Sequence, residues 1–234
     1  MTGRERAASL SALSGTFGHF VVDRLRLAFG ASPRHSLSAD ELWSAAPDSR
    51  LSAEATEEAT TLQSTAMLNH GYRTWVFGAA LARIDGVGLD LELFHAGALV
   101  HDVGLEHREE GRCFTYRSAE AAKAAADRAQ TEADRTLAMM DGITMHISPK
   151  LECEESALGY YLQVGAMADL AGLRAWELPA DLRARAARTY PREDAHEIIS
   201  SCWRAEVAAV PGGRAHFAEK YGMFSKILRF FPVE

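Results

Sequence analysis

Apolar positions along the chain recur at helical spacing, and alternating apolar and polar residues of the kind found in strands are scarce. The steadiest helical period covers residues 52–83, with a break expected near Met67 and a turn over 84–88. Residues 90–103 are apolar on all sides, which predicts a helix buried in the middle of a helical protein. Gly104 is expected to stop that helix.

Further boundaries come from serine, proline and glycine. A cap sequence at residues 38–41 predicts a short helix within a loop-rich segment, 31–56. The remaining helices are expected over 4–30 (with a break at 14–15), 119–129, 132–147, 154–170, 179–189, 194–209 and 215–228. The sequence thus predicts an all-α helical bundle over residues 51–234, with residues 1–50 as an N-terminal helical extension packed on it.

Composition narrows the class of protein. The 234 residues carry a formal net charge of −7 and no clustered basic face, which argues against nucleic-acid binding. Three widely spaced cysteines indicate reduced thiols rather than a disulfide framework. The N-terminus lacks the apolar core of a signal peptide, and the stretch 94–103 is too short to span a bilayer. We expect a cytoplasmic protein without membrane contact, and the sequence leaves a homo-oligomer open.

A histidine and an aspartate, His101 and Asp102, stand side by side at the end of the long apolar run 89–103. Burying either group without a partner costs several kcal/mol. A divalent metal ion satisfies both, because imidazole nitrogen and carboxylate oxygen suit zinc, iron or manganese. The pair therefore predicts a metal site, and further ligands are expected elsewhere in the sequence.

Three more polar residues are expected on buried helix faces. His70 shares a face with Ala66 and Phe77, and Asp169 stands on the apolar stripe that includes Leu162. His146 follows the same face as Ile143. Taken singly, each histidine is more often a hydrogen-bonded core residue, and a buried aspartate is often a cap or an arginine partner. Together they predict one site.

The sequence around these residues resembles a known family. His70, then His101-Asp102, then Asp169, each on its own expected helix, is similar to the HD superfamily of metal-dependent hydrolases. The resemblance covers about residues 47–230 and is closest to the branch that includes cyanamide hydratases. The stretches that carry it are NHGYRTWVFG (69–78), ALVHDVG (98–104), DGITMHISP (141–149), GAMADLAG (165–172) and TYPR (189–192).

The resemblance implies an all-helical HD domain that holds one zinc or iron ion. The ligands implied by position are His70, His101, Asp102 and Asp169. The family's His-x-x-Arg pattern matches His70 and Arg73, and its histidine before a small residue and proline matches His146. One departure argues against free cyanamide as substrate: where these hydratases have a sequence like FEVDGA, this chain has FTYRSA at 114–119.

Catalytic roles follow from the chemistry of such an ion. A water on it would have its pKa lowered from 15.7 toward about 7, and Asp102 or Asp169 could orient that water. His146 is the candidate for proton transfer, with a core histidine as the alternative. Arg73 is expected either to hold an anionic substrate group or to pair with a ligand carboxylate. The residues expected to wall the substrate pocket, or else to pack in the core, are Trp75, Phe114, Tyr116 and Arg117.

Four functions are compatible with these residues. The leading one is hydration or hydrolysis of a small nitrile-like or cyanamide-like molecule. A phosphohydrolase acting on a nucleotide or phosphomonoester would need several cations, and Arg73, Arg108, Arg112 and Arg117 lie near the motifs. A di-iron oxygenase would need more metal-site histidines than His146. An inactive binding module is disfavoured, because all four ligand types are retained.

Overall fold

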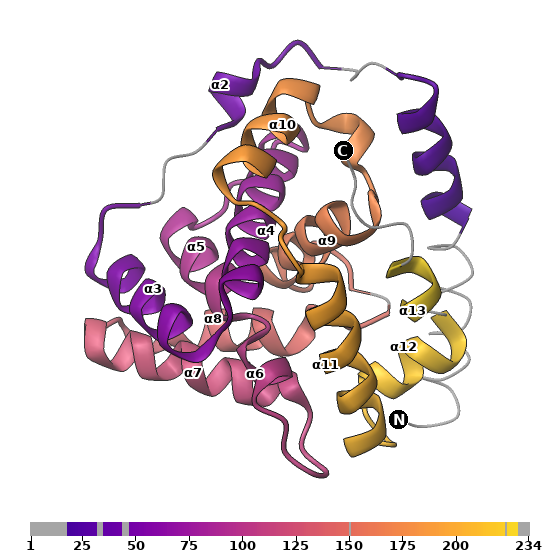
Figure 1. The fold of residues 1–234 in the computed structure, drawn as a ribbon. Coiled ribbons are helices and arrows are strands. Elements are labelled where there is room, and N and C mark those ends of the chain that lie inside the picture. The colour runs from indigo at the N-terminus through magenta and orange to yellow at the C-terminus, as the bar shows by residue number, and fades with distance from the viewer. Residues whose placement is uncertain (1–17, 32–34, 44–46, 150, 223, 229–234) are drawn as a thin grey trace.

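A computed structural model describes residues 18–31, 35–43, 47–149, 151–222 and 224–228 of the chain. Every regular element in these ranges is helical, and the one β feature there is an isolated bridge between Glu109 and Arg112 (Figure 1). The expected all-α class is thereby confirmed. Residues 18–28 are helical, and the elements that follow are α2 (Ala39–Leu42), α3 (Arg50–Leu62), α4 (Thr65–Ile84), α5 (Leu91–Val100), α6 (Val103–Glu106), α7 (Phe114–Ala129), α8 (Ala133–Met145), α9 (Ala157–Ala171), the 3-10 helix η1 (Ala175–Glu177), α10 (Ala180–Thr189), α11 (Ala195–Ala209), α12 (Arg214–Gly222) and α13 (Phe224–Ile227).

Helices α4 and α9 lie together at the centre of the bundle (Figure 1). Their backbones meet at Gly165, where a Cβ atom would lie 2.5 Å from the carbonyl oxygen of Thr74. Only glycine permits this approach, because any side chain would collide with backbone that cannot move aside. The close packing brings the polar residues of α4 and α9 within reach of one another, His70 and Asp169 among them.

The main apolar core lies between α3, α4, α5, α7, α8 and α9, and Phe94, Leu99 and Leu162 are fully buried in it. A second cluster of buried apolar side chains, around Ile199 and Trp203 of α11, packs against α12 and α13. None of the helices in the described ranges combines the length and hydropathy needed to cross a membrane.

The long helix expected over 52–83 is two helices, and its break lies at residues 63–64 rather than near Met67. Two serines set these boundaries. Ser49 caps α3 and Ser64 caps α4, each through a side-chain oxygen that accepts a backbone N–H three residues ahead. Such caps satisfy amide groups that the first turn of a helix leaves unpaired.

The expected continuous helix over 90–103 also divides, and the His101-Asp102 pair lies at the division. Helix α5 ends at Val100, His101 is its C-cap, and Asp102 precedes the short α6. Gly104 does not stop a helix but lies inside α6, where a Cβ atom would collide with the backbone carbonyl of Phe114. The glycine is needed for close packing of α6 on α7, not for termination.

Other boundaries shift by smaller amounts. Helix α7 begins at Phe114, so Ser118 lies inside it, and the Ser118 hydroxyl accepts the backbone N–H of Gly104. The expected helix over 215–228 is divided into α12 and α13. The predicted end of α9 is confirmed, since Gly172 closes it in the left-handed region with φ of +77°.

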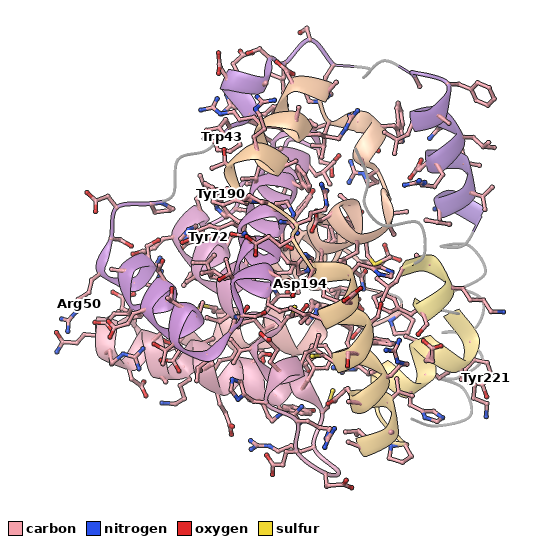
Figure 2. The ribbon with its side chains drawn as sticks, in the orientation of Figure 1. Trp43, Arg50, Tyr72, Tyr190, Asp194 and Tyr221 are labelled. Atoms are coloured by element: carbon pink, nitrogen blue, oxygen red, sulfur yellow. The ribbon has the colours of Figure 1, made fainter. Side chains whose placement is uncertain are left out.

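The described parts of the first fifty residues contact the main bundle. The predicted cap at 38–41 is confirmed as a full capping box between Ser38 and Glu41. Just after α2, Trp43 stacks on Tyr190, which stacks on Tyr72 of α4, and Figure 2 shows the three labelled residues in a column. The first part of the expected 4–30 helix, up to residue 17, lies outside the described residues. The division into an extension (1–50) and a body (51–234) stays a prediction.

Candidate metal centre

Two histidines of the site stand at the C-terminal ends of their helices, His101 after α5 and His146 after α8. The last carbonyls of a helix have no partner within it. Each ring uses one of them: Nδ1 of His101 donates to the carbonyl of Ala98 at 2.8 Å, and Nδ1 of His146 donates to that of Ile143 at 2.6 Å. A carbonyl only accepts, so both rings carry hydrogen on Nδ1.

This arrangement leaves the Nε2 lone pairs available. Burial lowers the pKa of His101 to about 4, against the smaller opposing effect of Asp102, so the ring is neutral near pH 7. The neutral ring with hydrogen on Nδ1 presents a bare nitrogen at Nε2, which is the form that binds a metal.

His70, His101 and Asp102 converge in the interior, and we call these three residues the ligand cluster. Asp102 Oδ2 lies 3.3 Å from His101 Nε2 and 3.7 Å from His70 Nε2. The three ligand atoms lie within 4.8 Å of one another, and all three residues are buried. Within the described part of the chain, neither Nε2 atom has a hydrogen-bond partner.

The charge of the cluster suits a cation. Burial alone raises the pKa of Asp102, but His101 and then His146 hold it below the ordinary aspartate value, so the carboxyl is ionised. Two imidazoles and one carboxylate are a donor set that zinc and iron accept. Two buried nitrogens without partners cost roughly 1–3 kcal/mol each, and a metal ion would satisfy both.

Asp169 lies behind His70 rather than in the ligand cluster. Its Oδ2 accepts from Nδ1 of His70 at 2.8 Å, and its Oδ1 accepts from Arg73 Nε and Arg192 Nη2, each at 2.8 Å. Burial opposes ionisation, yet the arginines and His70 keep the pKa of Asp169 far below its usual value. We call Asp169, Arg73 and Arg192 the Asp169 cluster.

The expected set had four ligands, whereas this geometry places three of them together and Asp169 behind His70. Of the two roles expected of Arg73, the structure shows the pairing with a carboxylate. Arg73 pairs with a carboxylate and also donates to the backbone carbonyl of Tyr190. The Asp169 carboxylate fixes the tautomer and orientation of His70, the arrangement commonly found behind metal-bound histidines. Sequence reasoning assigned Arg192 no role, although its TYPR motif was part of the resemblance.

His146 faces the other oxygen of Asp102, with Nε2 3.6 Å from Oδ1. Its ring stands edge-on to His101 and to Phe114, at centroid distances of 5.1 and 5.8 Å. Gln163 of α9 donates to the backbone carbonyls of His146 and Ser148 and so holds this turn in place. Sequence reasoning missed Gln163; its signal is that, apart from Asp169, it is the polar residue on the mainly apolar helix 157–171.

A cavity of about 780 Å³ begins at His101, Asp102 and His146. Its walls are mainly apolar side chains of α9, α11 and α13, and its far end is lined by Arg26 and Arg174. The ligand cluster therefore has one side in the protein interior, at His70, and one side open to a space that accepts a molecule.

Of the four residues expected to wall this pocket, Phe114 lines the cavity and the other three lie elsewhere. Trp75 is buried against His95, and Tyr116 is 53% exposed on the outer surface. Arg117 is buried, and its guanidinium donates to the carbonyl of Gly104 and to the carboxylate of Glu206. The expected pocket wall is revised accordingly.

Glu206 is a second residue that sequence reasoning missed. Its carboxylate accepts from Arg117 and from the backbone N–H of Phe114, joining α11 to the start of α7. It follows Ile199 and Trp203 on the buried stripe of α11, and a glutamate in such a stripe predicts a buried basic partner.

Neither a scan of the chain against models of known protein families nor a search among curated proteins found a match.

Proposed function

We propose that this chain is a metal-dependent enzyme of the HD superfamily that adds water to a small, uncharged substrate. One observation carries the proposal: two buried Nε2 atoms without hydrogen-bond partners, those of His70 and His101, face the ionised Asp102 at the end of a cavity. Structural histidines in cores pair both polar ends or bury one of them among apolar groups, whereas these two meet at a carboxylate.

The ion is expected to be zinc or iron(II), held by His70, His101 and Asp102. When bound, such an ion supplies Lewis-acid chemistry and lowers the pKa of a coordinated water from 15.7 toward about 7. Three protein ligands leave at least one position open, as catalytic sites require. Asp169, in this proposal, supports His70 from behind and is not a ligand.

His146 is proposed as the proton carrier. Its Nδ1 is engaged by the carbonyl of Ile143, so its Nε2 lone pair faces Asp102 and the cavity. In that position it can take a proton from the attacking water and return one to the substrate nitrogen. Phe114, edge-on to the ring, and Gln163, on the backbone, restrict its movement.

The proposed reaction is hydration of a C≡N group. The oxygen of water joins the nitrile carbon, one hydrogen of that water moves to the nitrogen, and the other stays on the oxygen. Transfer of this second hydrogen from oxygen to nitrogen then gives the amide. No group leaves, so no anionic product has to be stabilised. The family resemblance favours this class, and the departure at residues 114–119 argues against free cyanamide.

A phosphohydrolase is less well supported. Such an enzyme needs cations around the phosphate. Of the arginines expected near the motifs, Arg73 is engaged by Asp169 and Arg117 by Glu206. Within the described ranges, the only arginines that line the cavity are Arg26 and Arg174, and both have carboxylate partners. The di-iron alternative still has only His146 beyond the three-residue ligand cluster.

The test is metal analysis joined to an activity assay. We expect purified protein, reconstituted with zinc or iron(II) and freed of excess ion, to hold about one ion per chain and to convert nitriles to amides. Two irons per chain with oxygen consumption would contradict the proposal in favour of an oxygenase. If the protein binds neither zinc nor iron(II) tightly, the proposal loses its basis.

A further inference from the structure

We propose, on the basis of the function proposed above, that the substrate is a nitrile with a long, uncharged, apolar body. Its C≡N group would lie at His101, Asp102 and His146, and its body would lie along α9. The cavity that begins at these three residues carries this inference through its size, its walls and the charges at its far end.

The cavity is too large for a molecule of three heavy atoms. Its volume of about 780 Å³ lies within the range, about 300–1,000 Å³, of pockets that enclose drug-sized ligands. Its lining follows α9 from Tyr160 to Leu170. Ten residue steps along an α-helix cover about 15 Å, so the space is elongated along that helix.

The walls are mainly apolar along that length, with Tyr160 and Gln163 as polar side chains of α9 among them. Between the two ends, the side chains that face the cavity come from three helices that are distant in sequence, and they include Val164, Met167, Leu170, Ile199, Trp203 and Phe224. Walls of this kind favour a ligand whose apolar surface gains free energy by leaving water. They offer few hydrogen-bond partners to polar groups on the ligand.

Both arginines that the described residues place at the far end are already paired with carboxylates, so neither is free to bind an anionic tail. Arg26 donates to Asp23 at 3.2 Å, and Arg174 donates to Asp85 and Glu177 at 2.7–2.8 Å. Glu152 also lines the cavity, and its carboxylate forms no ion pair with the described residues that line it. A carboxylate or phosphate at this end would meet acidic groups, so an uncharged body fits better.

Binding strength should follow the length of the apolar body. Hydration changes only the C≡N group, so the body contributes through burial. Each buried CH₂ group is expected to strengthen binding about fourfold, the equivalent of about 0.8 kcal/mol. The amide products of the same chain lengths should show the same dependence without being consumed.

The experiment is calorimetric titration of the metal-loaded protein with butanamide, hexanamide and octanamide. We expect Kd to fall about 16-fold for each pair of added methylenes, with a negative heat-capacity change of binding. Met167→Trp, which fills the middle of the cavity, should abolish this dependence. Leu137→Trp is the matched control, because Leu137 is 56% exposed on α8 and lies away from the cavity.

The outcomes separate this inference from the proposed function. Equal Kd values across the three amides would overturn the inference, even if the protein holds its ion and hydrates nitriles. Chain-length dependence that is lost in Met167→Trp and kept in Leu137→Trp would support binding of an apolar body along α9, and a failure to hydrate nitriles would then count against the proposed function alone. A dependence that both tryptophan variants retain would place the apolar body elsewhere and overturn it.

Discussion

Two buried polar clusters in the described part of this protein share the imidazole of His70 and differ in what their carboxylates face. In the Asp169 cluster, one carboxylate receives N–H groups from His70, Arg73 and Arg192, so both of its oxygens are engaged. In the ligand cluster, two imidazole nitrogens face one carboxylate and neither has a hydrogen-bond partner among the described residues. Protein donors engage both oxygens of the first carboxylate, although Arg73 Nη2 has no hydrogen-bond partner among the described residues, whereas the second cluster could hold an added ion.

The difference shows that burial and residue type do not identify a ligand site by themselves. Asp169 and Asp102 are both buried aspartates beside histidine, and the pKa of each is lowered. What separates them is the presence or absence of arginine and the open space beyond. A closed cluster of charges is costly to break, while an open one costs stability as it stands and could be offset by a bound ligand.

Breaking the ligand cluster should have the largest effect. In His101→Ala we expect the metal content to fall from about one ion per chain to near zero, with loss of activity, because one of three ligands is removed. Metal analysis after reconstitution measures this. His95→Gln is the matched control, since His95 is equally buried but lies outside the cluster, and it should keep its ion. Full metal occupancy in His101→Ala would refute the assignment.

Breaking the Asp169 cluster should instead affect the fold. Asp169→Asn leaves two buried arginine contacts without a counter-charge, so we expect the free energy of unfolding to fall by about 3–5 kcal/mol. Metal affinity should weaken by about 10- to 100-fold, because His70 loses its support. Urea unfolding and metal titration measure the two effects. Asp141→Asn, on the exposed surface of α8, should change stability by less than about 0.5 kcal/mol. Complete loss of metal with unchanged stability would instead make Asp169 a ligand.

A buried histidine outside both clusters sharpens the comparison. His95 has a partnerless Nε2 like those of the ligand cluster, but its neighbours are Ser52, Tyr72 and Trp75 rather than a carboxylate. Burial lowers the pKa of His95 to about 4 from an ordinary value of 6.5. Between these two pH values the folded protein thus binds fewer protons than the unfolded chain. The stability that the neutral His95 ring contributes is therefore lost as the pH falls from about 6.5 to about 4.

The size of this loss is on the order of 3 kcal/mol for His95. Urea unfolding of metal-free protein across this pH range should therefore show a steeper loss in the wild type than in His95→Gln, where the titrating group is absent. Parallel pH profiles for the two proteins would show that His95 does not remain neutral in the fold.

The smallest expected effect concerns the packing behind the ligand cluster. Gly104→Ala places a Cβ atom against the backbone carbonyl of Phe114, and we expect a loss of about 1–3 kcal/mol as α6 moves away from α7. Gly212→Ala is the control, because no heavy atom lies within 4 Å of the Cβ position there. Thermal unfolding of both variants measures the difference. Equal melting temperatures would contradict the close packing at Gly104.

The class of fold and most helices were predictable, because apolar periodicity and serine or glycine caps act locally. The errors arise where one local signal competes with another. Ser52 and Ser49 are both acceptable caps, and the structure uses Ser49. Gly104 has the residue type of a helix stop, but its backbone is helical because contact with Phe114 requires a glycine there. That requirement depends on a residue ten positions away and cannot be seen in the local sequence.

The site was predictable in its members but not in its pairing. Polar residues on apolar helix faces pointed to His70, His101, Asp102, His146 and Asp169, and the structure brings them into one region. Which aspartate meets arginine depends on Arg192, which reaches Asp169 from a segment 23 residues away. Likewise, the choice of pocket walls depends on α11 and α13, which lie far in sequence from His70, His101 and His146. Long-range packing of this kind is not contained in spacing or composition.

The carbonyl contacts of His101 and His146 have a consequence for how this protein can vary. Both rings are oriented by backbone oxygens, of Ala98 and Ile143, and the side chains at those two positions take no part. Both side chains are fully buried, so core packing limits substitution there, but replacements that fit leave the two carbonyls in place so long as both helices end where they do. Insertion or deletion of a single residue just ahead of either histidine would rotate its ring away from the carboxylate, so the lengths of α5 and α8 are expected to be constrained more strictly than the identity of these two side chains.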